Sequence, residues 1–178
     1  MSDYWLAPRP GTEALMLLGF VHVILQNDLA DDNFIKTWVN WHAWLDARGH
    51  ERDFDGFMEE LKVEYAWATP EHVAEVTGLT AAQIRTVGRE IGEAGSKFAA
   101  HVWRNSASGN KGGWQVARCL QFVVTLVGAV NAEGGTSGNG YNKFVVTVEP
   151  VPDTDPDPSD VVAFSHRVPL SSMAHIRH

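Results

Sequence analysis

Apolar residues in the first half of the chain recur every three or four positions, which is the spacing of amphipathic helices. Between the apolar runs lie residues that begin or end helices, namely the N-caps Thr12, Asp31 or Asp32, Thr69 and Thr80, and the stop signals Gly49 and Gly78. The pattern therefore predicts helices over residues 12–28, 32–49, 54–62, 69–78 and 80–95.

A different pattern begins near residue 97. The short apolar run 97–103 predicts a buried strand, and a polar, glycine-containing loop at 104–113 joins it to an apolar helix over 114–130. A second glycine-rich loop and a candidate strand, "KFVVTVEP", follow. This order predicts a helix-rich α/β domain at residues 1–148 and a Pro/Asp-rich linker or tail at 149–178. Two strands are few for a doubly wound sheet, so we expect an incomplete piece of a larger protein.

Charge and composition narrow the function classes. The 178 residues include 22 acids and 14 bases, and a net charge of -8 argues against nucleic acid or an anionic membrane as a general partner. The single cysteine, Cys119, excludes an internal disulfide and makes a zinc or iron–sulfur site in this chain unexpected. No signal peptide or membrane-spanning stretch is visible, so we expect no membrane insertion and take the cytoplasm as the default compartment.

The loop Arg9–Glu13, immediately before the first helix, is the main candidate site. Free N–H groups and the helix dipole favour an anion there, Arg9 adds a guanidinium, and Gly11 permits close backbone approach. The Glu13 carboxylate suits the paired N–H donors of a guanine. On chemistry alone, a capped helix start with Thr12 at the N-cap is the commoner explanation of the same residues.

The loop that begins at Arg104 is the second candidate, because α/β folds bind ligands where a strand leads through a glycine loop into a helix. It offers Arg104, Ser108 and Asn110 as donors. The chain has neither the G-x-G-x-x-G pattern nor the phosphate-binding P-loop pattern, so an ordinary connection remains the alternative.

The spacing of the tryptophans raises a third possibility. Trp38, Trp41 and Trp44 are three residues apart and would share one side of helix 32–49. Packing under a neighbouring helix is the preferred interpretation, and a partner interface is the alternative. Cys119 lies among apolar residues and is interpreted as an inert core thiol.

Three stretches together resemble the dimethyl sulfoxide reductase family of molybdopterin oxidoreductases, which bind molybdenum or tungsten through two pterin guanine dinucleotides. The stretch "DYWLAPRPGTEALMLLGFVHVIL" is similar to the family's R-P-G-T-D/E-A-L loop. "TPEHVAEVTGLTAAQIRTVGREI" is similar to its helix pair, and "HVWRNSASGNKGGWQVARCLQFVVTLVGAVNAEGGTSGNG" to its strand, cofactor loop, helix and terminal Gly-Gly. The resemblance covers roughly residues 3–144 and implies a Rossmann-like, three-layer dinucleotide-binding domain.

The resemblance also implies roles for single residues. Arg9, Gly11, Thr12 and Glu13 would bind the guanosine end of one molybdopterin guanine dinucleotide. The loop with Arg104, Ser108 and Gly109 would face the pterin, and Gly134 and Gly135 would let the backbone pass close to the cofactor. The chain departs from the pattern in two places. Glu13 stands where the family more often has Asp, and the stretch Ser108, Gly109 and Asn110 stands where members often carry a Gln.

The resemblance also implies parts that this chain lacks. Family members carry the metal ligand, and any iron–sulfur cysteines, before the matching region, and a later domain closes over the cofactor. We therefore expect no metal ligand and no identifiable catalytic residue here, inactivity of the chain alone, and partnership with the rest of the oxidoreductase polypeptide or its subunits. A stand-alone module that binds a guanine nucleotide or the cofactor without catalysis is the alternative, and an interaction protein that uses the tryptophans is a third.

Overall fold

The structure is a computed structural model that describes residues 2–101 and 112–137. These residues lie in one compact unit, Met1–Gly138, so the predicted boundary at residue 149 falls outside them. The described part is helical, which confirms the helix-rich prediction. Its elements are α1 (Glu13–Gln26), α2 (Asp32–Trp38), α3 (Trp41–Arg48), α4 (Phe54–Glu64), α5 (Pro70–Thr77), α6 (Ala81–Ala94), the 3₁₀ turn η1 (Gly95–Lys97) and α8 (Gly113–Leu126).

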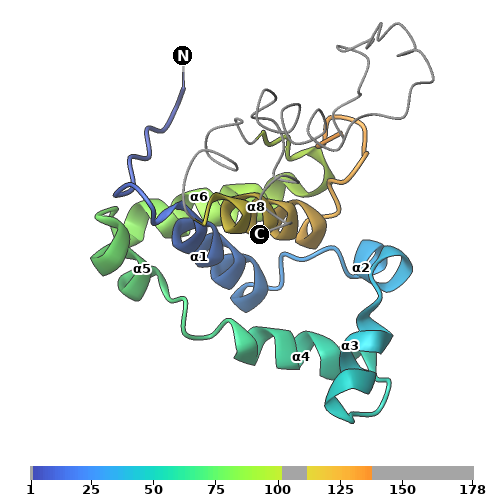
Figure 1. The fold of residues 1–178 in the computed structure, drawn as a ribbon. Helices are drawn as coiled ribbons and strands as arrows, with labels where there is room; N and C mark the ends of the chain where they lie inside the picture. Colours follow the sequence, from blue (N-terminus) through green and yellow to red (C-terminus); the bar gives the residue numbers. More distant parts are fainter. Residues whose placement is uncertain (1, 102–111, 138–178) are drawn as a thin grey trace, which may run out of the picture. The chain divides into compact units, whose positions relative to one another are not determined.

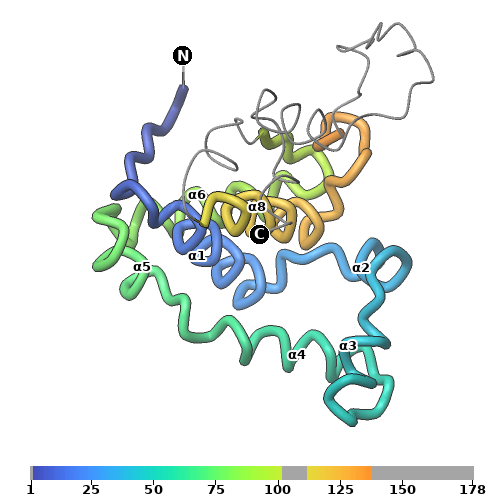
Figure 2. The backbone as a smooth tube through the Cα atoms, viewed as in Figure 1, coloured from blue at the N-terminus to red at the C-terminus, as the bar shows by residue number. Residues whose placement is uncertain are grey.

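Helix α1 lies at the centre of this unit and packs against α5, α6 and α8, whereas α4 runs along its other side (Figures 1 and 2). Val21 and Ile24 of α1 are fully buried, as are Ile84 of α6 and Val123 of α8. One apolar core therefore fixes the position of α1, and with it the position of the loop that precedes α1.

The helix caps follow the sequence closely. Asp31 accepts a hydrogen bond from the Phe34 N–H, and Thr69 accepts one from the His72 N–H. Thr80 forms a complete capping box at the start of α6, and Gly49 and Gly78 end their helices in the left-handed conformation. Thr12 occupies the predicted N-cap position of α1, but its side chain makes no capping hydrogen bond.

The prediction of one helix over 32–49 is wrong, because the chain breaks between α2 and α3. Val39 adopts an extended conformation and α3 restarts at Trp41. The break separates the tryptophans: Trp38 is 75% exposed, whereas Trp41 is buried edge-on to Phe54 and Trp44 packs against Phe57. Packing thus explains two of the three tryptophans, and they do not share one helical side.

The Rossmann-like sheet is not confirmed in the described residues. Of the predicted strand 97–103, Lys97 ends η1, Phe98 is extended, and residues 98–101 form no assigned strand. The Thr136 hydroxyl takes the place of a neighbouring strand, since it donates to the Phe98 carbonyl and accepts from the Ala100 N–H. A single bridge, Val130 to Thr136, forms nearby. The candidate strand at 143–150 lies outside the described residues, which include no helix long and apolar enough to cross a membrane.

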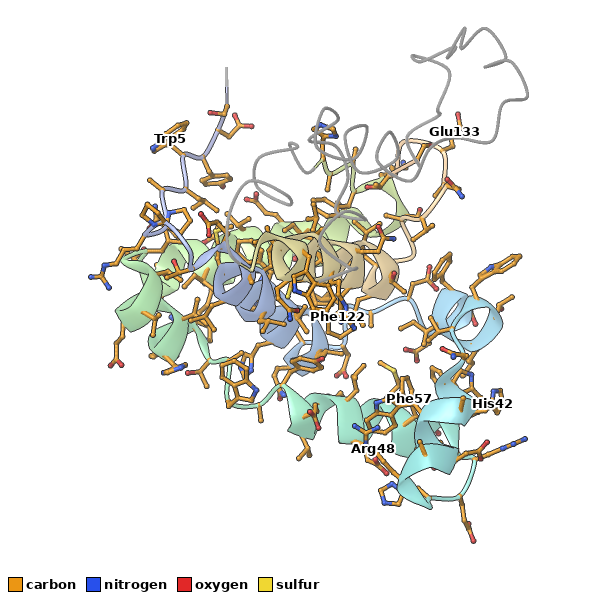
Figure 3. All side chains as sticks on the ribbon, viewed as in Figure 1. Trp5, His42, Arg48, Phe57, Phe122 and Glu133 are labelled. Carbon is orange, nitrogen blue, oxygen red and sulfur yellow. The ribbon has the colours of Figure 1, made fainter. Side chains whose placement is uncertain are left out.

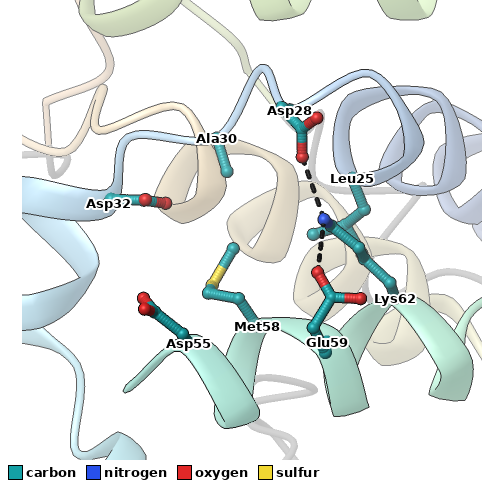
Figure 4. Close-up of a pocket in the computed structure, with 8 residues that line it drawn as sticks. All are labelled: Leu25, Asp28, Ala30, Asp32, Asp55, Met58, Glu59 and Lys62. Carbon is teal, nitrogen blue, oxygen red and sulfur yellow. Dashed lines mark hydrogen bonds and ion pairs between the residues drawn. The ribbon is translucent and has the colours of Figure 1, made fainter.

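Lys62 of α4 forms an ion pair with the segment that follows α1, beside a hollow of about 220 Å³ (Figure 4). Its ammonium lies 2.7 Å from the Glu59 carboxylate and 2.9 Å from the Asp28 carboxylate, which follows α1. These two hydrogen bonds, that to Glu59 foremost, raise the pKa of Lys62 to about 12.

The raised pKa of Lys62 predicts a loss of stability at alkaline pH. A folded-state pKa above the ordinary value of 10.5 stabilises the fold below pH 10.5, and this contribution disappears as the pH rises through about 12. Because the partner carboxylates are exposed, we expect a contribution of about 1 kcal/mol. The free energy of unfolding, measured with urea, should decrease less between pH 10 and pH 12 for Lys62→Met than for the wild type. An equal decrease in both proteins would contradict this role of Lys62.

Candidate functional site

The opening loop forms a tight turn centred on the Arg9 peptide group. The Arg9 carbonyl accepts from the Thr12 N–H at 3.0 Å and from the Thr12 hydroxyl at 2.7 Å. Gly11 adopts a φ of +88°, which favours glycine, and no atom lies within 4 Å of where a Cβ would stand. The Thr12 hydroxyl thus closes the turn before α1 instead of capping the helix.

The Arg9 side chain lies against the end of α5, far away in the sequence. Its Nη1 donates to the carbonyls of Glu75 and Val76, both at 2.9 Å, and its backbone N–H donates to the Thr77 carbonyl at 2.8 Å. These are carbonyls of the last turn of α5, where the helix dipole is negative and a cation is stabilised. The sequence indicated the charge at Arg9 but not these partners.

Tyr4, which lies nearer the N-terminus in the same segment, forms a hydrogen bond to α6. Its hydroxyl donates to a Glu90 carboxylate oxygen at 2.6 Å, and this hydrogen bond raises the pKa of Tyr4. The neighbouring Trp5 is 81% exposed and points away from the helices (Figure 3). The role of Tyr4 could not be predicted from the sequence, because nothing local to residues 3–5 indicates a partner on α6.

Glu13 begins α1 and carries an unsatisfied acceptor. Its Oε2 atom is buried, and no hydrogen-bond donor among residues 2–101 and 112–137 reaches it. A buried carboxylate oxygen without a donor costs the full desolvation of that atom, more than the 1–3 kcal/mol typical of a neutral group. Proteins keep such atoms where something else satisfies them. A ligand with N–H donors would satisfy this atom, and to reach it the ligand would have to displace the protein groups that cover Oε2.

Gly134 and Gly135 lie at the end of the region that resembles the family, and their nearest neighbours are residues of this chain. A Cβ on Gly135 would lie 2.6 Å from the Ser96 carbonyl oxygen and nearer still to that of Ala129. Gly134 adopts a φ of +78°, with only the Lys97 residue nearby at 3.8 Å. The close backbone oxygens explain why position 135 is glycine, and the positive φ explains it for position 134, whereas the predicted approach of a cofactor to both stays a prediction.

The remaining candidate residues add no second cluster of functional side chains to the described part of the chain. Arg104, Ser108 and Gly109 lie outside the described residues. Within the described ranges, no group of three or more His, Cys, Asp or Glu is arranged to hold a metal ion. Cys119 is partly buried on α8, and burial raises the pKa of its thiol, which disfavours the reactive thiolate.

Comparison with known proteins confirms the resemblance. No family model matches the chain. It is 29% identical over 149 residues to the dimethyl sulfoxide reductase DmsA of Haemophilus influenzae, a match that covers 77% of this chain and 17% of the relative. It is 34% identical over 97 residues to a nitrate reductase of Symbiobacterium thermophilum, covering 54% of this chain and 12% of that protein. The fold is similar to acetylene hydratase from Pelobacter acetylenicus, with a TM-score of 0.57, 26% identity, and coverage of 75% of this chain and 16% of that one.

The chain thus resembles the dimethyl sulfoxide reductase family of molybdopterin oxidoreductases in both sequence and fold, as predicted. It spans less than a fifth of the length of the relatives described, 17% and 12% of the two reductases. The match supports oxidoreductase chemistry by resemblance and leaves the activity of a whole protein to be proposed.

Proposed function

We propose that this chain is part of a molybdenum or tungsten oxidoreductase, and that its opening loop binds the guanosine end of a molybdopterin guanine dinucleotide. The similarity to two reductases and to the acetylene hydratase fold supports the first statement. The second rests on a single observation: the unpaired, buried Oε2 of Glu13 at the position that the family resemblance assigns to the nucleotide.

The chemistry of a guanine fits this position. A guanine presents its N1–H and exocyclic amino group side by side, and a carboxylate accepts both in a bidentate, charge-assisted pair. The first N–H groups of α1, from Glu13 onward, have no partner within the helix and favour the phosphates of a dinucleotide. Glu13 would hold the base and the start of α1 the phosphates, while Arg104, Ser108, Gly109, Gly134 and Gly135 remain the candidates nearer the pterin.

The bound cofactor would supply two-electron redox chemistry at its metal. The share of this chain is to bind and orient the nucleotide end. Its partner would be the remaining polypeptide of the oxidoreductase or its other subunits. Exposed aromatic side chains support such a partner, because tryptophan is enriched in protein interfaces: Trp5 is 81% exposed, Trp67 52% and Trp114 56%.

Substitution of Glu13 by glutamine tests the guanosine site. Glutamine keeps the size of the side chain but replaces one acceptor oxygen with an amino group that opposes the donors of guanine. We expect the affinity of the full chain for guanosine, measured by isothermal titration calorimetry, to fall about 30-fold, since each charge-assisted hydrogen bond contributes roughly 1.5–3 kcal/mol.

Inosine and a distant acid provide the controls. Inosine lacks the exocyclic amino group, so the wild type should prefer guanosine to inosine and Glu13→Gln should lose that preference. Glu93→Gln, on an exposed position of α6, should bind guanosine as the wild type does. A wild-type chain that does not bind guanosine, or an unchanged affinity in Glu13→Gln, would refute the site.

A further inference from the structure

Arg9 takes part in five hydrogen bonds, and all of them join it to the protein's own backbone or to the Thr12 hydroxyl. Its N–H and Nη1 reach three carbonyls in the last turn of α5, while its carbonyl holds the turn at Thr12. Arg9 therefore connects the end of α5 to the turn that delivers Glu13, four residues further along the chain.

We propose that Arg9 is a positioning residue of the nucleotide site and not a ligand of the phosphate, an inference that rests on the proposed function. In this arrangement the last turn of α5 supports the loop, because its carbonyls accept the hydrogen bonds of Arg9. The charge of the guanidinium is directed to the negative end of α5, and the backbone it holds sets where α1 begins and where the Glu13 carboxylate lies. The site would thus be assembled from two segments distant in sequence, Arg9–Glu13 and Glu75–Gly78.

Gly78, the C-cap residue of α5, also lies beside the Arg9 side chain. It ends α5 at a φ of +80°, and a Cβ at this position would lie 3.5 Å from Nε of Arg9 and 3.6 Å from its Cγ. The left-handed glycine exposes the last carbonyls of α5, and an alanine here would be strained by the positive φ while its Cβ lay in van der Waals contact with the arginine stem. A change at Gly78 should therefore disturb the loop even though Arg9 keeps its charge.

The two possible roles of Arg9 predict different results with guanosine, which has no phosphate, and GDP, which has two. A positioning role predicts that Arg9→Gln weakens the binding of guanosine and GDP by the same factor, about fivefold to tenfold, because the loop is held less often in its competent arrangement. A phosphate contact predicts a loss for GDP alone. Both affinities are measured by calorimetry on the full chain, with helix content checked by circular dichroism.

Two further variants keep the test decisive. Gly78→Ala retains Arg9 and should also weaken guanosine and GDP equally. Arg89→Gln removes an exposed arginine of α6 and should change neither affinity. A loss in Arg9→Gln that is confined to GDP, or no loss for either ligand, would overturn the positioning role and leave the guanosine site standing. Absence of guanosine binding in the wild type would overturn the proposed function and this inference with it.

Discussion

Gly135→Ala is expected to destabilise the protein by at least about 3 kcal/mol, which is a large part of the stability of a domain of this size. The added methyl group would stand 2.6 Å from the Ser96 carbonyl oxygen and closer to that of Ala129. Both neighbours are backbone atoms, so no side chain can turn aside to make room. The Ala129 carbonyl also accepts the Thr136 N–H at 2.8 Å, and this turn would have to open.

The adjacent glycine is the matched control for this prediction. Gly134 has a positive φ but open space around its Cβ position, so Gly134→Ala should cost only the conformational strain, about 1–2 kcal/mol. Urea unfolding followed by circular dichroism at 222 nm measures both. Equal effects of the two substitutions would contradict close packing as the reason for a glycine at 135, since Gly134 and not Gly135 has the positive φ.

Local chemistry explains which parts of the fold could be predicted. The caps at Asp31, Thr69 and Thr80 depend on residues within three positions of each other, so the sequence contains all the information needed. The break between α2 and α3 has no such local signal, since neither proline nor glycine occurs in residues 32–48. Burial of Ile35, Trp41 and Leu45 against the core accompanies the break, and such tertiary packing overrides helix propensity.

The partners of segment 97–103 and of Arg9 lie far away in the sequence, and for this reason local patterns did not predict them. An apolar run predicts an extended segment, but it does not tell whether another strand or the Thr136 hydroxyl will pair with it. Similarly, an arginine before a helix suggests an anion site, whereas the carbonyls that it binds lie 66 and 67 residues later. Glu13 was identified as a candidate from sequence, but its unpaired oxygen became visible only in the structure.

The close approach of α1 and α6 depends on glycines in both helices. A Cβ on Gly88 of α6 would lie 2.9 Å from the Val23 Cβ and 3.3 Å from the Phe20 Cα, both in α1. A Cβ on Gly19 of α1 would in turn lie 3.1 Å from the Ile84 side chain. Without side chains at these positions the two helices approach closely, and α1 is held where its first turn presents Glu13.

Gly88→Val is therefore expected to lower the free energy of unfolding by about 3 kcal/mol, because the two helices must move apart to admit the side chain. The displacement of α1 should also weaken guanosine binding, since Glu13 lies in its first turn. Thr86→Val places the same side chain on the exposed face of α6 and should stay within about 0.5 kcal/mol of the wild type. If Gly88→Val were as stable as Thr86→Val in urea unfolding, close helix packing would not be what fixes α1, and the position of Glu13 would need another cause.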